Sequence, residues 1–124
     1  MRLLDTNVFV DHLRGHPRAV AFFQRLGEAE DVAFSSLSEA ELLAGEANAD
    51  PAARNTLLRF LRRWTKIPVS NPVAVAAGDL VRTHRLDVPD ALVAATALHH
   101  KAELITRNVK HFRRIKGLRV RVPY

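Results

Sequence analysis

The chain has 124 residues, which is room for one hydrophobic core, so we expect residues 1–124 to form a single domain. It contains no cysteine, which excludes disulfides and thiolate metal sites and fits a reducing, cytoplasmic setting. No signal peptide is evident and no stretch approaches the ~18 apolar residues of a membrane span, so we expect no membrane association.

The formal net charge is +6, and the excess of basic residues is concentrated. Residues 101–124 contain eight Lys or Arg and one acid, Glu103, while residues 59–66 form a second basic group. Such patches attract phosphate backbones or an acidic protein. A solvated surface that only keeps the protein soluble is the competing interpretation.

Hydrophobic patterning predicts short strands that alternate with helices. Apolar runs bounded by turn residues indicate strands, and apolar residues spaced three or four apart indicate helices. In chain order we expect a strand at 1–4, a helix at 17–26, a strand at 32–34, a helix from Ser36 or Ser38 to near Gly45, a helix at 51–61, a strand at 67–69, a helix from Asn71 or Pro72 to Val81, a helix at 90–100, and strands at 104–106 and 118–122.

This alternation is typical of the α/β class. It predicts a central parallel sheet of four or five short strands flanked by helices on both faces, with the strand that contains Pro68 at an edge. In such folds, ligands bind at the carboxyl ends of the strands near a topological switch point. Chemistry is therefore expected at that edge of the sheet.

Asp5 directly follows the first expected strand. A carboxylate at the mouth of a strand is costly to desolvate unless a metal ion, a hydrogen-bond network or solvent compensates its charge. Asp-Thr-Asn at residues 5–7 is also good turn chemistry, so an Asx-turn or a helix N-cap is the competing interpretation. Position alone leaves the role of Asp5 open.

Two further acids have a similar double interpretation. Ser38-x-x-Glu41 is a capping box, in which Glu41 would bond to the backbone of Ser38. Asp90 follows Pro89 in the first turn of the expected helix, where the helix dipole favours an acid. The small apolar residues after Asp90 would hold that turn firmly against the strand ends.

Asn108 supplies a neutral oxygen after the strand at 104–106, at a position that matches Asp5 on its own strand. His111 follows three residues later, and a surface or structural role is favoured for it. Hard oxygen ligands without cysteine suit Mg²⁺ or Mn²⁺ and argue against structural zinc. Carboxylates packed together also require a cation to neutralise them.

Four ordered segments resemble the signature segments of PIN-domain ribonucleases, and most closely those of VapC-type toxins from toxin–antitoxin pairs. The resemblance covers nearly the whole chain, and its segments are Leu4–Val8, Ser38–Leu42, Pro89–Leu98 and Thr106–Phe112.

The resemblance implies that Asp5, Glu41 and Asp90 are metal ligands. Asn108 stands where the family often has a fourth acid, so the set supports one Mg²⁺ or Mn²⁺ position and leaves a second open. Polar residues that match the lining of the site in relatives are Thr6, Asn7, Ser38 and Thr106. Basic residues just after or within the fourth segment, placed to hold RNA phosphates, are Arg107, Lys110, Arg113 and Arg114.

The implied function is a metal-dependent endoribonuclease, the toxin of a type II pair, which cleaves transfer, ribosomal or messenger RNA. The resemblance also implies a cognate antitoxin and a homodimer or larger toxin–antitoxin assembly, with the apolar faces of 17–26 and 51–61 as candidate dimer surfaces. A catalytically weak antitoxin-binding or RNA-binding PIN-like module is one alternative. An aspartyl phosphotransferase with Asp5 as nucleophile is another, which Asn7 disfavours because those enzymes use Asp-x-Asp.

Overall fold

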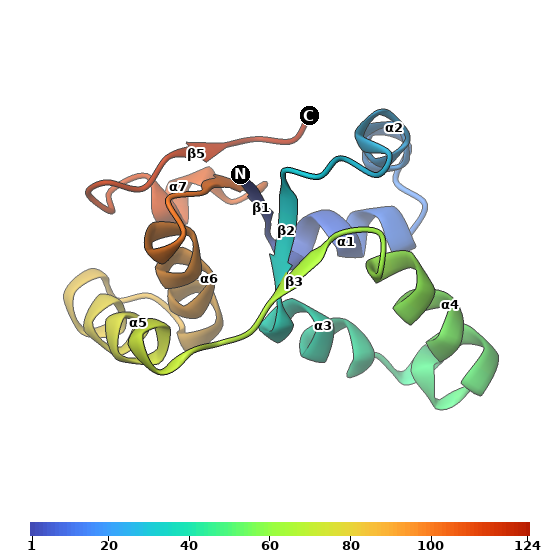
Figure 1. The fold of residues 1–124 in the computed structure, drawn as a ribbon, viewed down its shortest axis with the longest axis horizontal. Coiled ribbons are helices and arrows are strands. Elements are labelled where there is room, and N and C mark those ends of the chain that lie inside the picture. The colour runs from blue at the N-terminus through green and yellow to red at the C-terminus, as the bar shows by residue number, and fades with distance from the viewer.

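A computed structural model describes all of residues 1–124. Five parallel strands form one sheet in the order β3-β2-β1-β4-β5 (Figure 1). The predicted α/β class and parallel sheet are confirmed. The strands are β1 (Arg2–Leu4), β2 (Val32–Ser35), β3 (Thr65–Ile67), β4 (Glu103–Ile105) and β5 (Val120–Arg121).

Helices cover both faces of the sheet, as Figure 1 shows. On one side lie α1 (Thr6–Leu13), α2 (Pro17–Leu26) and α4 (Pro51–Leu61), with α3 (Ser36–Leu43) and the short 3-10 helix η1 (Glu46–Ala49) leading into α4. On the other side lie α6 (Val88–His99) and α7 (Val109–Phe112), with α5 (Asn71–His84) packed on α6. No helix combines the length and apolar character needed to cross a bilayer.

The two faces of the sheet carry separate cores because successive strand residues point to opposite sides. Leu4 faces an aromatic cluster that includes Phe9, Phe23 and Trp64. Leu3 faces the alanine-rich α6 together with Phe112. The small residues of α6 bring this helix close to the sheet, which is the packing that its sequence predicts.

The parallel register aligns the carboxyl ends of the three central strands. Leu4 lies opposite Phe34 on β2 and opposite Ile105 on β4, so Asp5 and Thr106 emerge at the same edge. The chain runs from β1 to β2 on one side and returns to β4 on the other. The boundary between β1 and β4 is therefore the topological switch point, where this class of fold binds ligands.

Several predicted boundaries were wrong. The third strand is Thr65–Ile67 instead of 67–69, since Trp64 is buried just before it and pairing with β2 ends at Ile67. It is nevertheless an edge strand, as predicted. The last strand is only Val120–Arg121, because its pairing with β4 covers two residues.

Residues 6–13 form α1, a helix that was not predicted from the sequence, where only an Asx-turn or a helix N-cap was considered at Asp5. Its N-cap is Asp5, whose side chain accepts a hydrogen bond from the Thr6 N–H. Val8 and Phe9 are fully buried on this helix, so tertiary packing stabilises a segment rich in β-branched residues that favour strands. This error matters for function because α1 displays the residues that follow Asp5.

The apolar faces of α2 and α4 were candidate dimer surfaces. In the structure, Phe23 and Leu26 of α2 and Leu57 and Leu61 of α4 all pack in the core beside the sheet. Much of these two apolar faces is therefore buried within the chain.

Candidate active site

Asp5 is only 5% exposed, and both of its carboxylate oxygens are satisfied by the protein. Oδ1 accepts from the Thr6 N–H at 2.8 Å, and Oδ2 accepts from the Thr106 hydroxyl at 2.8 Å. Burial, together with the smaller effect of the negative charges of Asp90 and Glu41, raises the pKa of Asp5 to about 6 against the lowering effect of these two hydrogen bonds. The cap interpretation of Asp5 is thus correct, and it leaves the carboxylate at the switch point.

Glu41 does not form the predicted capping box. The N-cap of α3 is Ser35, whose hydroxyl accepts from the Leu37 N–H at 3.1 Å, so Ser38 lies inside the helix. The Glu41 carboxylate instead accepts from the Thr6 hydroxyl at 2.7 Å. Because β2 extends to Ser35, the helix starts earlier than the box requires, and Glu41 is turned toward α1.

Thr6 joins Glu41 to the buried Ser38. The Thr6 hydroxyl lies 2.8 Å from the Ser38 hydroxyl, which is fully buried. A hydroxyl has one proton to donate, and the Thr6 proton goes to the Glu41 carboxylate, which can only accept. Ser38 must therefore donate to Thr6, and the three side chains form a directed network that ends on Glu41.

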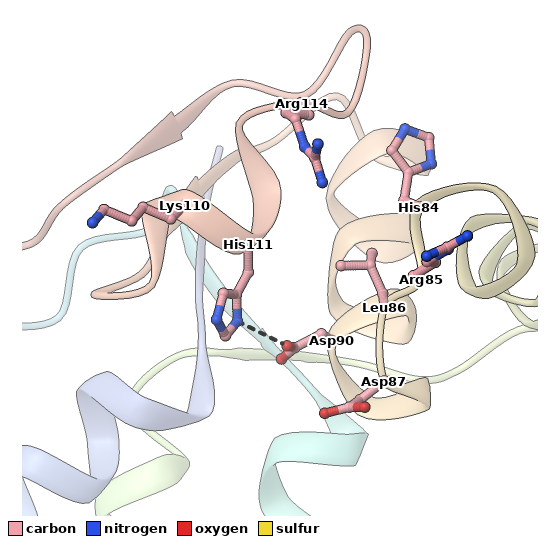
Figure 2. Close-up of a pocket in the computed structure, with 8 residues that line it drawn as sticks. All are labelled: His84, Arg85, Leu86, Asp87, Asp90, Lys110, His111 and Arg114. Atoms are coloured by element: carbon pink, nitrogen blue, oxygen red, sulfur yellow. Dashed lines mark hydrogen bonds and ion pairs between the residues drawn. The ribbon is translucent and has the colours of Figure 1, made fainter.

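Asp90 occupies the first turn of α6, and Asp87 is the N-cap residue, without a side-chain hydrogen bond. The Asp90 carboxylate is 27% exposed and contacts Nδ1 of His111 at 3.4 Å. Figure 2 shows the His111 ring reaching from α7 across to Asp90 on α6. The structure therefore brings His111 to one of the three acids, a contact that sequence separation concealed.

Thr106 connects the end of β4 to the start of α1. Its hydroxyl oxygen accepts from the side-chain amide of Asn7 at 3.2 Å and from the Asn108 N–H at 3.1 Å. Asn7 also accepts, at Oδ1, from the Arg107 N–H at 3.4 Å. Asn108 is exposed and forms the N-cap of α7 without a side-chain hydrogen bond. The backbone N–H of Asn108 is hydrogen-bonded to the network around Asp5, whereas its side-chain amide is not.

The three acids share one electrostatic neighbourhood, since the charges of Asp90 and Glu41 both act on Asp5. No three acidic or histidine side chains converge as a ready metal cluster, because each carboxylate is turned toward a protein group. The donor set nevertheless fits a hard divalent cation. Carboxylate and amide oxygens surround the switch point without a thiol, and the mutual repulsion of three carboxylates is relieved by positive charge.

A basic hollow adjoins Asp90 between α6, α7 and the end of α5. Figure 2 shows Arg114 pointing into the space between α7 and α6, while Lys110 lies on the outer side of α7. The contribution from the end of α5 was not predicted, although the His84-Arg85 pair that ends this helix is a signal for it in the sequence. The lining residues are His84, Arg85, Leu86, Asp87, Asp90, Lys110, His111 and Arg114.

The four basic residues expected near the site differ in their surroundings. Lys110 and Arg114 line the hollow, and Arg113 is exposed without an ion-pair partner. Arg107 is instead paired with Asp11, and both oxygens of that carboxylate lie 2.8 Å from its Nη1.

Comparison with known proteins agrees with this geometry. The family model of the PIN domain matches residues 2–118. Ribonuclease VapC19 of Mycobacterium tuberculosis is 39% identical over 118 residues, which are 90% of this chain and 92% of the relative. Ribonuclease VapC2 of Rickettsia felis is 31% identical over 94% of this chain and 92% of the relative. A solved toxin–antitoxin complex from Klebsiella pneumoniae has a TM-score of 0.83 and 30% identity, and covers 100% of this chain and 98% of that one.

A parallel sheet with acids gathered around its switch point, together with these matches, defines the class: the chain belongs to the PIN-domain family of nucleases. Its relatives place it more narrowly among the ribonucleases of the VapC type.

Proposed function

We propose that residues 1–124 form one nuclease domain, a Mg²⁺- or Mn²⁺-dependent endoribonuclease that is the toxin of a type II toxin–antitoxin pair. The observation that carries the proposal is the burial of the Asp5 carboxylate next to two other acids. This carboxylate is buried at the switch point, and the charges of Glu41 and Asp90 raise its pKa further. Burial of an ionised carboxylate beside two other negative charges is unfavourable unless a cation joins it.

In this proposal Asp5, Glu41 and Asp90 hold the cation, and Asn108 adds a neutral donor. When bound, the cation supplies Lewis acidity, which acidifies water and offsets charge on the phosphoryl transition state. The protein's contribution is orientation. Thr106 and the Thr6 N–H fix the two oxygens of Asp5, and the Thr6 hydroxyl fixes Glu41.

RNA phosphates approach through the basic hollow beside Asp90. Lys110, Arg113 and Arg114 contact phosphates in this proposal, joined by His84 and Arg85 from the end of α5. Contacts of this kind position RNA without reading its sequence, so they account for affinity and not for the choice of RNA. Arg107 was expected to belong to this group, but Asp11 offsets its charge.

The proposed partner is a cognate antitoxin. Support comes from the solved relatives, which include the toxin–antitoxin complex from Klebsiella pneumoniae and VapBC2 from Rickettsia felis bound to a DNA fragment from their promoter, at a TM-score of 0.81. A homodimer, alone or within a larger toxin–antitoxin assembly, is part of the same proposal.

Induced expression in a bacterial host tests this function. Expression of the wild-type chain is expected to arrest growth, and sequencing of RNA 5′ ends is expected to reveal new ends at a small number of sites. Asp5→Asn, which retains the N-cap, should do neither. Co-expression of the protein encoded beside this chain should restore growth. The same new ends in the Asp5→Asn culture, or none in either culture, would contradict the proposal.

A further inference from the structure

Asp11 is a buried carboxylate to which the nuclease mechanism assigns no role. It lies on α1, six residues after Asp5, and is 7% exposed. Nη1 of Arg107 lies 2.8 Å from each of its oxygens. The Tyr124 hydroxyl also donates to it. Asp11 therefore joins three parts of the chain: α1, the turn after β4, and the segment after β5.

The same turn after β4 holds Asp5. Arg107 is flanked by Thr106, whose hydroxyl donates to Asp5, and by Asn108, whose N–H donates to Thr106. The Arg107 N–H donates in turn to Asn7 on α1. The turn is thus bound to α1 at two residues: at Asn7, which accepts from the Arg107 N–H and donates to the Thr106 hydroxyl, and at Asp11, through the Arg107 guanidinium.

Tyr124 keeps the Asp11 end of this link in place. Burial, followed by the hydrogen bond to Asp11, raises the pKa of Tyr124 to about 12, so the hydroxyl stays protonated at physiological pH. Its ring stacks on His16 with centroids 5.7 Å apart and meets the edge of Phe22 at 6.2 Å. Asp11 consequently has charged and neutral donors at once, which is what a buried carboxylate needs.

We propose that Asp11 is a positioning residue of the active site: through Arg107 it holds the turn Thr106–Asn108 against α1, so that Thr106 keeps its hydrogen bond to Asp5. The inference rests on the proposed nuclease function only for its catalytic consequence. In this proposal Arg107 differs from its basic neighbours. It pairs with Asp11 inside the protein, whereas Arg113 contacts RNA phosphates.

Amide hydrogen exchange tests the structural half of this inference without metal or RNA. In protein treated with EDTA, Asp11→Asn and Arg107→Gln are expected to accelerate exchange of the Arg107 and Asn108 amides by about 10-fold or more, because those amides open when the turn detaches. Tyr124→Phe removes a single donor and should give a smaller change in the same amides. Unchanged exchange at both positions in Asp11→Asn would overturn the inference.

A matched control is available in the pair Arg2 and Asp31. In this pair, too, an arginine contacts both oxygens of an aspartate, here at 3.1 and 2.9 Å, but the pair lies at the opposite end of β1. Asp31→Asn should leave exchange at 107 and 108 unchanged, as well as cleavage. If it accelerates those amides as strongly as Asp11→Asn does, the effect is general loosening and the inference is wrong.

Steady-state kinetics test the catalytic half, with an RNA oligonucleotide that contains a cleavage site mapped from the sequenced ends. A positioning role predicts that Asp11→Asn and Arg107→Gln each lower kcat about 10- to 100-fold with little change in KM. The double variant should lose no more than the worse single variant, because both changes break one link. A raised KM with unchanged kcat in Arg107→Gln would instead make Arg107 a phosphate contact and overturn the assignment. Exchange at 107 and 108 decides the structural half even if the wild-type chain cleaves no RNA.

Discussion

The hydroxyl of Thr106 donates to Oδ2 of Asp5 at 2.8 Å, although 101 positions separate the two residues. The contact exists because β1 and β4 are neighbours in register, with Leu4 opposite Ile105. Of the two hydrogen bonds to Asp5, it lowers the pKa of the carboxyl more. The charge of the central acid therefore depends on a residue from the far end of the sequence.

Thr106→Val is expected to raise the pKa of Asp5 above its wild-type value of about 6, because it removes this donor while preserving shape. Carboxyl-carbon NMR titration in EDTA measures the pKa directly. Thr106→Ser retains the hydroxyl and should titrate like the wild type. A pKa for Asp5 in Thr106→Val at or below the wild-type value would show that the hydrogen bond does not stabilise the carboxylate.

The raised pKa of Asp5 makes stability depend on pH in metal-free buffer. The folded chain holds the Asp5 proton up to about pH 6, whereas the unfolded chain releases it near the ordinary value of 3.8. Between these values the folded state binds more protons, so this contribution to the free energy of unfolding falls as pH rises and is lost above pH 6. Asp5→Asn removes the penalty and should be more stable than the wild type by about 1–3 kcal/mol at pH 7.5.

Urea melts in EDTA at pH 4 and pH 7.5 measure this difference. The two proteins should be nearly equally stable at pH 4, where Asp5 is protonated in the folded state. Addition of Mg²⁺ at pH 7.5 should stabilise the wild type and leave Asp5→Asn unchanged, since only the wild type gains a compensating charge. Equal stability of the two proteins at both pH values would contradict the assigned effect of burial.

Glu41→Gln separates charge from hydrogen bonding at the second acid. Glutamine can still accept from Thr6, and α3 is capped by Ser35, so the variant should fold normally. Cleavage is expected to fall at least ~100-fold, because a second ligand charge is lost. Glu39→Gln is the matched control, since this neighbour pairs with Lys66 away from the site and should retain activity. Full activity in Glu41→Gln would remove Glu41 from the proposed ligand set.

Asp90→Asn is expected to lower cleavage by several orders of magnitude without unfolding the domain. The side chain is partly exposed and makes only a long contact with His111, so its charge contributes little to stability. Thermal melts check the fold, and cleavage at saturating Mg²⁺ checks the rate. Asp79→Asn, an exposed change on α5, serves as the control. An unchanged rate in Asp90→Asn at saturating Mg²⁺ would refute its role.

Asn108→Asp is expected to tighten Mg²⁺ binding because it adds a fourth charge near the cluster. Asn108 is exposed and its side chain makes no capping hydrogen bond, so the change should cost the fold little. Isothermal titration calorimetry compares the dissociation constants of the variant and the wild type. Weaker or equal binding by the variant would count against placing Asn108 in the site.

Much of the architecture could be predicted from the sequence, because strand and helix patterns have different periods and the buried strands are continuous apolar runs. Helix α1 could not, since its β-branched residues favour strands locally and only burial of Val8 and Phe9 makes it helical. The capping box at Ser38 was wrong for a related reason: pairing of β2 with β3 extends to Ser35, which becomes the N-cap of α3. In both cases tertiary structure decided between two local options.

In the candidate site, too, some contacts could be predicted from the sequence and others depend on tertiary structure. Asp5 and Thr106 follow strands, so their common edge follows from the sheet alone. The contact of His111 with Asp90 depends on how α7 folds back. The pairing of Arg107 with Asp11, which also accepts from Tyr124, depends on the turn after β4 and the segment after β5. Side-chain partners across such distances have no local signature. Arg107 therefore resembled its basic neighbours in the sequence although its surroundings differ.

The most direct test of the central claim is the metal dependence of RNA cleavage by the purified chain. Wild-type protein freed of metal with EDTA should be inactive and should recover full activity with Mg²⁺ or Mn²⁺, while Asp5→Asn, correctly folded by circular dichroism, should stay inactive at every metal concentration. Equal, metal-independent cleavage by both proteins would contradict the account.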